Sequence, residues 1–91
     1  MQLHVLAAFV VLAAGVWTGL SKSEWLIVLL LIGGMLALEM MNSAIERVVD
    51  LASPDIHPLA KEAKDIAAGA VLVFAAASAI IGLLIFIPKW F

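Results

Sequence analysis

Long apolar stretches alternate with short polar breaks along the chain. Residues 3–20 and 66–87 contain no Asp, Glu, Lys or Arg. Each stretch is long enough for a helix that crosses a hydrocarbon core ~30 Å thick at ~1.5 Å rise per residue. The uncharged run over 25–38 covers only about 21 Å as a helix, so that helix spans a membrane only if it continues through Glu39. The pattern predicts an all-α membrane protein.

Three membrane-spanning helices in a single domain are expected, over about residues 3–20, 25–49 and 59–87. Ser23 is the predicted N-cap of the second helix, because serine side chains accept hydrogen bonds from the first backbone N–H groups of a helix. Pro58 suits the first turn of the third helix, and Pro88 is predicted to end it. The short breaks between the helices predict an antiparallel bundle.

Aromatic and basic residues predict how this bundle lies in the membrane. Trp17, Trp25 and Trp90 fall at the same face of three antiparallel spans, as an interfacial aromatic belt does. The other face receives three basic residues and the tryptophan face two, namely Arg47, Lys61 and Lys64 against Lys22 and Lys89. The excess of basic residues predicts a multi-pass protein of the plasma membrane with its 47–65 region in the cytoplasm and its C-terminus outside.

Composition agrees with a membrane location and excludes several other classes. The mean hydropathy is +1.21 and only 13% of residues are charged, against about a quarter in soluble domains. A net charge of −2 gives no reason to expect a nucleic-acid partner, and the absence of cysteine excludes disulfides and thiolate metal sites. Alanine and glycine are dense in the spans, and small residues let helices pack closely in lipid. Self-association is therefore expected.

One face of the middle helix carries an unusual set of polar groups. They recur at i, i+3, i+7 and i+11, as Glu39, Asn42, Glu46 and Asp50. Glu39 lies about 21 Å along the helix, within the hydrocarbon, and Glu46 about 31 Å along, at its boundary. An ionisable group at membrane depth costs a few kcal/mol and marks a functional site by default. The alternative is a structural hydrogen-bond cluster that holds helices together.

The start of the third helix carries the chemistry that complements these carboxylates. His57, Lys61, Lys64 and Asp65 occupy its first two turns. Lys64 and Asp65 are expected to meet Glu46 and Asp50 in a cytoplasmic pocket. Carboxylates of this kind suit Mg²⁺, which takes one or two of them together with phosphate oxygens and water. A lysine suits the phosphates themselves, and Glu39 is a candidate general base.

The two segments together resemble the signature of a known family. They read Glu39-Met-Met-Asn42-Ser-Ala-Ile-Glu46-Arg-Val-Val-Asp50 and His57-Pro-Leu-Ala-Lys61-Glu-Ala-Lys64-Asp65. The match is to the small bacterial, prokaryotic-type diacylglycerol kinases, which are trimeric three-span membrane enzymes of phospholipid biosynthesis. The second segment and the Ile-Pro-Lys ending resemble the Gram-positive branch, whose members phosphorylate undecaprenol.

The resemblance assigns roles by position. It implies that Glu39 accepts the proton of the lipid hydroxyl and that Asn42 helps to bind and position this group. It implies contacts to ATP at the cytoplasmic end, from Glu46, Asp55, His57, Lys64 and Asp65. Glu46 would also hold Mg²⁺. Each site would lie between neighbouring subunits of a homotrimer.

One part of the family pattern is missing from this sequence. Family members begin with a cytoplasmic amphipathic surface helix that supplies a second acidic ligand for Mg²⁺ and ATP. Here the sequence starts with Met1-Gln2-Leu3-His4, at the entry to the first span, and the surface helix is expected to be absent.

Three functions follow from these patterns. The leading one is ATP-dependent phosphorylation of a membrane lipid at the cytoplasmic interface, with undecaprenol favoured over diacylglycerol. An oligomeric proton or ion pathway through Glu39 is an alternative that requires neither a phosphate-binding lysine nor Mg²⁺. A truncated, catalytically inactive homologue of the lipid kinases is the third.

Overall fold

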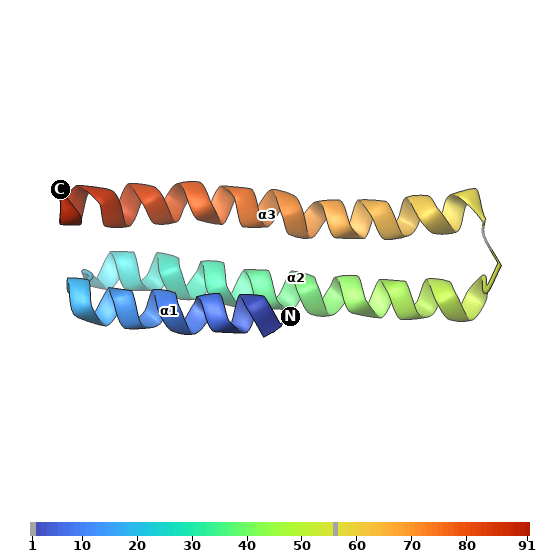
Figure 1. Cartoon of the computed structure of the whole chain (residues 1–91), viewed down its shortest axis with the longest axis horizontal. Coiled ribbons are helices and arrows are strands. Elements are labelled where there is room, and N and C mark those ends of the chain that lie inside the picture. The colour runs from blue at the N-terminus through green and yellow to red at the C-terminus, as the bar shows by residue number, and fades with distance from the viewer. Residues whose placement is uncertain (1, 56) are drawn as a thin grey trace.

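The computed structural model describes residues 2–55 and 57–91, and these residues form three α-helices. They are α1 (Gln2–Thr18), α2 (Lys22–Ala52) and α3 (Pro58–Trp90). The chain passes three times along the long axis of a rod that measures 52 × 18 × 18 Å (Figure 1). Its radius of gyration is 16.3 Å, against about 12 Å for a globular domain of this length. The all-α class predicted from the sequence is confirmed.

Tight backbone capping joins α1 to α2. Gly19 has a φ of 79°, a left-handed conformation that glycine adopts without steric cost, and its N–H donates to the carbonyl of Gly15 at 2.9 Å. Ser21 then caps α2. Its Oγ accepts from the N–H of Glu24 at 3.2 Å, and its own N–H donates to the Glu24 carboxylate at 2.9 Å. The prediction of Ser23 as the cap was wrong, because the reciprocal capping box requires the acidic residue three positions after the cap.

Of the two prolines predicted to mark the ends of α3, Pro58 lies at its start and Pro88 lies inside the helix. Pro58 occupies its first turn as predicted, and His57 caps the helix by accepting the N–H of Leu59 on Nδ1 at 3.1 Å. Pro88 does not end the helix, which continues to Trp90. A proline removes one backbone hydrogen bond. The last turn is held nevertheless, because the Phe91 N–H donates to the Ile87 carbonyl at 3.0 Å and side chains of this turn bond to the other two helices.

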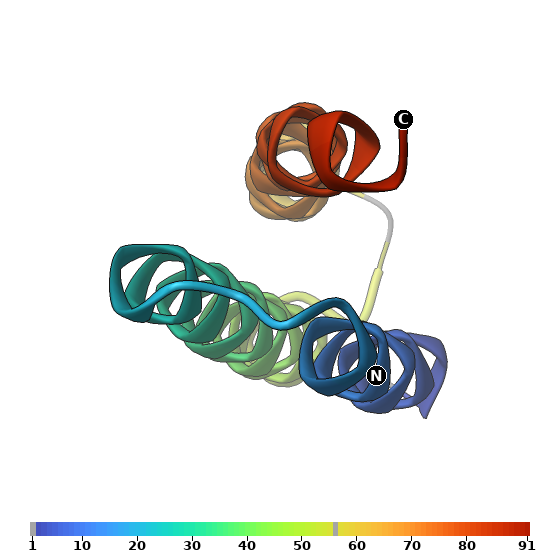
Figure 2. The same ribbon diagram turned by 90° about the vertical axis from the view of Figure 1, so that its left-hand side faces the viewer.

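The buried apolar cluster lies at one end of the rod, where α1, α2 and α3 all meet. It consists of Leu20, Val28, Ile85 and Phe86, with Trp25 packed against it. End-on, the three helices lie at the corners of a triangle (Figure 2). Further along, α2 and α3 remain close: a Cβ on Gly34 would lie 2.6 Å from Cζ of Phe74.

Most of the apolar surface faces outward. Leu3, Leu30 and Leu72 are 80%, 74% and 70% exposed, and so large an apolar surface requires lipid or protein around it. Among the described residues, α2 and α3 are long and apolar enough to cross a membrane. α1 is also apolar, but its 17 residues extend only about 25 Å. The long helices and the outward apolar surface are those of a membrane protein.

Candidate functional site

The polar face of α2 carries a series of side-chain contacts that continues along the helix. Nearest the middle of the rod, Glu39 bonds to His4 of α1. One turn further, Asn42 Nδ2 donates to Glu46 Oε1 at 3.4 Å. Near the end of the helix, Asp50 Oδ1 pairs with Lys64 Nζ of α3 at 2.5 Å. We call this part of the molecule, from Glu39 to the α2–α3 connection, the acidic end.

Glu39 is the most buried carboxylate of this series. Its side chain is 11% exposed, and its Oε1 contacts Nδ1 of His4, whose side chain is 37% exposed. Our sequence analysis did not assign His4 to the site. The signal was nevertheless present, because a histidine is the one titratable side chain in the apolar run of residues 3–20. Along the chain, His4 lies about as far before the α1–α2 turn as Glu39 lies after it.

Asn42 lies between the buried and the exposed carboxylates. Its side chain is half-buried, and its Oδ1 is a buried acceptor with no hydrogen-bond partner among the residues that the structure describes. Buried acceptors are satisfied in most proteins, so one left over calls for an explanation such as a ligand. Glu46 is exposed at the surface of the same helix face. The Asn42 amide therefore donates its N–H to the exposed Glu46 carboxylate and keeps its oxygen on the buried side.

Lys64 gives the acidic end its positive charge. Besides its ion pair with Asp50, its ammonium group is attracted by the Glu46 carboxylate. It also lines a pocket of about 380 Å³ beside the α2–α3 connection, with Val49, Asp55, His57, Ala60 and Lys61. His57 uses Nδ1 to cap α3, so its Nε2 is the ring nitrogen left for a ligand. The structure thus brings Asp55, His57 and Lys64 to one pocket.

Asp65 does not join them. It is exposed and is not one of the described residues that line the pocket. Neighbouring positions on a helix point about 100° apart, so Asp65 does not share the direction in which Lys64 reaches α2. The expectation that Lys64 and Asp65 meet Glu46 and Asp50 together is therefore met by Lys64 alone.

The carboxylates of the acidic end suit a metal that takes few protein ligands. Among the described residues there is no group of three or more His, Cys, Asp or Glu side chains that could hold a metal by itself. Mg²⁺ is commonly bound by one or two carboxylates, and phosphate and water oxygens complete its shell. The exposed carboxylates of Glu46 and Asp50, one turn apart, fit that mode of binding.

An apolar groove of about 580 Å³ leads along the bundle from the buried carboxylate. All three helices line it, with His4 from α1, Leu36 from α2 and Ser78 and Gly82 from α3. Its walls are hydrophobic apart from His4, Ser78 and the indole of Trp90. The small residues of α3 leave room for a chain-like apolar ligand.

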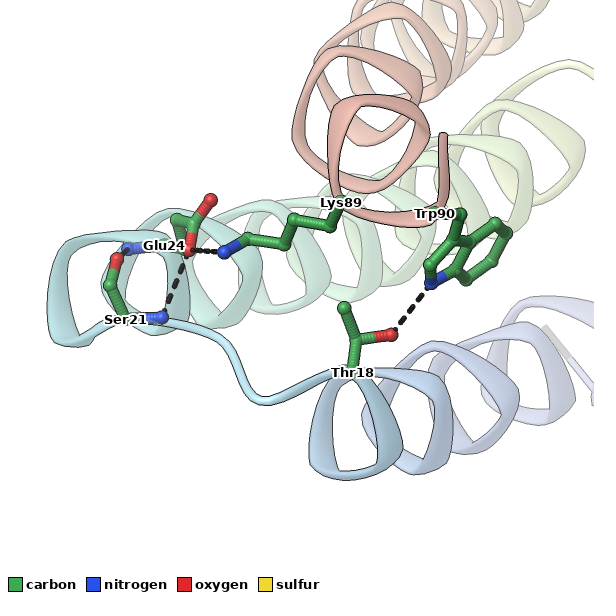
Figure 3. Close-up of polar contacts among 5 residues, drawn as sticks. All are labelled: Thr18, Ser21, Glu24, Lys89 and Trp90. Carbon is green, nitrogen blue, oxygen red and sulfur yellow. Dashed lines mark hydrogen bonds and ion pairs between the residues drawn. The ribbon is translucent and has the colours of Figure 1, made fainter.

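The opposite end of the rod, which we call the tryptophan end, is closed by contacts within the chain. Trp90 Nε1 donates to Thr18 Oγ1 at 2.9 Å, and Lys89 pairs with Glu24 at 2.9 Å (Figure 3). The rings of Trp17 and Trp90 lie 6.5 Å apart in an edge-to-face arrangement. With Trp25 in the adjacent apolar cluster, all three tryptophans gather at this end.

Glu24 bonds to two groups of the tryptophan end, the backbone N–H of Ser21 and the ammonium group of Lys89. It precedes the predicted span of residues 25–49. The backbone N–H of Ser21 lowers the pKa of its carboxyl below the usual value, and the ammonium group of Lys89 lowers it further. At neutral pH Glu24 is accordingly a charged, hydrogen-bonded carboxylate.

Comparison with known proteins identifies relatives over nearly the whole chain. The family model described as prokaryotic diacylglycerol kinase matches residues 1–86. Undecaprenol kinase of Bacillus subtilis is 60% identical over 88 residues, which are 97% of this chain and 72% of that protein. A diacylglycerol kinase of Helicobacter pylori is 38% identical over 72 residues, 79% of this chain and 56% of that protein. One of Synechocystis sp. is 49% identical over 55 residues, 59% of this chain and 31% of that protein. The chain thus spans less than two thirds of the last two relatives, and no solved structure matches it.

Proposed function

The chain belongs to the prokaryotic diacylglycerol kinase family, in its undecaprenol kinase branch, and we propose that it transfers the γ-phosphoryl group of ATP to the hydroxyl group of a membrane lipid. The family is one of lipid kinases, which are phosphotransferases with an alcohol acceptor. We favour undecaprenol over diacylglycerol, because the relative with 60% identity carries that name. The reaction would take place at the cytoplasmic face of the plasma membrane.

The graded polar face of α2 carries this proposal. A half-buried carboxylate, a buried amide oxygen and an exposed carboxylate follow one another at Glu39, Asn42 and Glu46. A lipid alcohol must approach from the bilayer and ATP from the water, so their meeting point requires groups of both kinds on one surface. The apolar groove that begins at His4 offers the lipid tail a path to the buried carboxylate.

On the lipid side, Glu39 and Asn42 would handle the hydroxyl group. The buried Oδ1 of Asn42 would accept the hydroxyl hydrogen as the lipid arrives, and the hydroxyl group would then turn this hydrogen toward Glu39. Glu39 takes the proton when the oxygen attacks the γ-phosphorus, and the bond to the leaving ADP oxygen breaks. General-base assistance of this kind contributes about 10²–10⁴ in rate.

On the nucleotide side, the charged groups would neutralise the phosphates. Phosphoryl transfer depends mainly on positioning and electrostatics, and the Lys64 ammonium is already drawn toward the exposed carboxylates of α2. Glu46 would hold Mg²⁺, which when bound offsets the charge of the phosphate oxygens. Asp55 and His57 would lie along the nucleotide in the pocket that they line. Asp65 would contact the phosphate end from outside this pocket.

The same proposal includes an orientation and an assembly. All three helices would cross the membrane as an antiparallel bundle, with the 47–65 region in the cytoplasm and the C-terminus outside. α2 extends about 46 Å and α3 about 50 Å, so a hydrocarbon core of ~30 Å would enclose Glu39 and leave the residues from Glu46 onward in the interface. The outward apolar surface and the small residues of the spans support a homotrimer, with each site formed between subunits.

Transfer of radiolabel from ATP in proteoliposomes tests the function. The protein is reconstituted with undecaprenol or with diacylglycerol, and a methyl ether of each lipid serves as a control without a hydroxyl group. We expect Mg²⁺-dependent labelling of undecaprenol, weaker labelling of diacylglycerol and none of the ethers. If neither alcohol acquires label, the kinase function is wrong for this chain.

A further inference from the structure

His4 is the partner that the structure places against the carboxylate assigned to proton transfer. Its Nδ1 contacts Oε1 of Glu39 across the α1–α2 interface, 35 positions away in the chain. The Glu39 side chain is 11% exposed and that of His4 37%. A hydrogen bond to a carboxylate as buried as Glu39 is worth more than one at the surface, because water competes poorly for it.

Within residues 2–55 and 57–91, the other titratable side chains of α2 and α3 lie well along the helices from this pair. α2 carries no titratable side chain between Glu24 and Glu39, and α3 carries none between Asp65 and Lys89. The nearest further carboxylate on the same face is Glu46, about two turns along α2, where Asn42 bonds to it. Among the described residues, the later carboxylates of α2 lie two turns or more from Glu39.

We propose that His4 is a positioning residue for Glu39: it donates its Nδ1 hydrogen to Oε1 and so aims the carboxylate at the lipid hydroxyl. This inference rests on the proposed kinase function. A glutamate has three side-chain torsions, and an anchor on Oε1 removes rotamers that turn the carboxylate away from the groove. The proton of the alcohol then passes to Oε2, and no bond to His4 forms or breaks.

The location of His4 supports a role in the reaction beyond helix packing. It lines the apolar groove as well as contacting Glu39, so the same side chain borders both the path of the lipid tail and the proton acceptor. A purely structural contact between α1 and α2 has no need of a histidine, because the other groove-lining residues of α1 are alanine and valine.

Three substitutions test the proposal by label transfer in proteoliposomes. His4→Leu removes the donor, His4→Asn keeps an N–H donor near the place of Nδ1, and His4→Gln moves the donor to the place of Nε2. Gln2→Leu, which removes an exposed polar side chain from the same turn of α1, is the matched control. For His4→Leu we expect kcat to fall about 10- to 100-fold, with the KM for ATP within about twofold of wild type.

Rescue by the variant that restores the donor separates positioning from a structural role. In His4→Leu the loss should fall on kcat, while the thermal unfolding temperature in detergent stays close to that of wild type. His4→Asn should recover most of kcat, whereas His4→Gln should resemble His4→Leu. Gln2→Leu should change neither kcat nor the unfolding temperature.

Each other outcome overturns the proposal. Equal activities of His4→Asn and His4→Gln would mean that the direction of the donor is irrelevant, and this comparison holds even if His4→Leu fails to fold. An unchanged kcat in His4→Leu, with labelling intact in wild type, would reject the role of His4 and leave the kinase function standing. A wild-type protein that labels no lipid would remove the kinase function and this inference with it.

Discussion

The tryptophan end and the acidic end of the bundle use their polar groups in opposite ways. At the tryptophan end, Trp90 and Lys89 of α3 bond to Thr18 of α1 and Glu24 of α2, beside the buried apolar cluster. At the acidic end, the carboxylates of Glu46 and Asp50 face outward, and a pocket opens between α2 and α3. The polar side chains of the tryptophan end bond to one another within the chain. Those of the acidic end can still bind ligands.

The contacts that stabilise the bundle and the groups that are proposed to react thus lie at different ends of the molecule. Contacts that join all three helices are concentrated at the tryptophan end, far from the proposed phosphate site, and the apolar groove for the lipid tail runs toward them. α1 lies beside only part of α2 in Figure 1, and the contact of His4 with Glu39 brings it to the first residue of the polar series. Beyond this level the ion pair of Asp50 with Lys64 links α2 to α3, and Glu46 is exposed.

Removal of the buried base should have the largest effect. Glu39→Gln keeps the size of the side chain and an oxygen that accepts from His4, but it cannot take a proton. We expect label transfer to fall about 10²- to 10⁴-fold while thermal unfolding in detergent stays close to that of wild type. An active Glu39→Gln protein would contradict the assignment of the base.

Loss of the phosphate-binding cation should come next. In Lys64→Ala we expect transfer to fall about 100-fold, the usual cost of removing one group that stabilises transition-state charge. Lys61→Ala is the matched control from the same pocket and should cost much less, since Lys64 is the lysine paired with α2. A proton pathway through Glu39 would behave differently: Lys64→Ala would leave proton flux into vesicles unchanged.

A change in the packing between the two ends should be smaller again. In Gly34→Ala the new methyl group lies 2.6 Å from the Phe74 ring, so the ring must move, at a cost of about 1–3 kcal/mol. Gly33→Ala is the control, because a Cβ there meets nothing within 4 Å; it should be neutral or stabilising by up to about 1 kcal/mol. Chemical denaturation in detergent measures both. Equal effects would show that α2 and α3 do not approach closely at Gly34.

The smallest effect is expected from acid at the tryptophan end. Since the folded-state pKa of Glu24 is lowered, its stabilising contribution is complete above the unfolded value of about 4.3. It is lost as the pH falls through the lower folded pKa. Glu24→Gln should therefore flatten the dependence of the unfolding temperature on pH in the acidic range and leave label transfer at neutral pH unchanged. A steeper dependence in the variant would contradict the ion pair with Lys89.

Patterns along the chain were sufficient for the class, the family and the polar face of α2. Helical spacing placed Glu39 and Glu46 on one face, Pro58 began α3, and the three tryptophans gathered as predicted. The resemblance and the enzyme class, a lipid kinase phosphotransferase, are confirmed by the matches to the family and its members. The predicted spans and the roles of the site residues stay predictions.

What the patterns missed depends on contacts between segments far apart in the chain. His4 became part of the site only when α1 was placed beside α2. Pro88 did not end α3, because Lys89 and Trp90 are held by residues of the other two helices. Helical spacing could not show that Asp65 does not line the pocket, because Lys61, one turn earlier on α3, does line it. Ser21, by contrast, could have been found locally, since Glu24 stands three residues after it.

The central claim is that the polar face of α2 runs from inside the membrane into the cytoplasm, and labelling of single cysteines tests it most directly. The sequence contains no cysteine, so Glu39→Cys, Asp50→Cys and Lys22→Cys each introduce one thiol. An impermeant maleimide should modify position 50 only from the cytoplasmic side and position 22 only from the outside. Position 39 should stay unmodified from both, because thiols react as thiolates in water. Modification of position 39 as fast as position 50, or of positions 22 and 50 from the same side, would contradict the account.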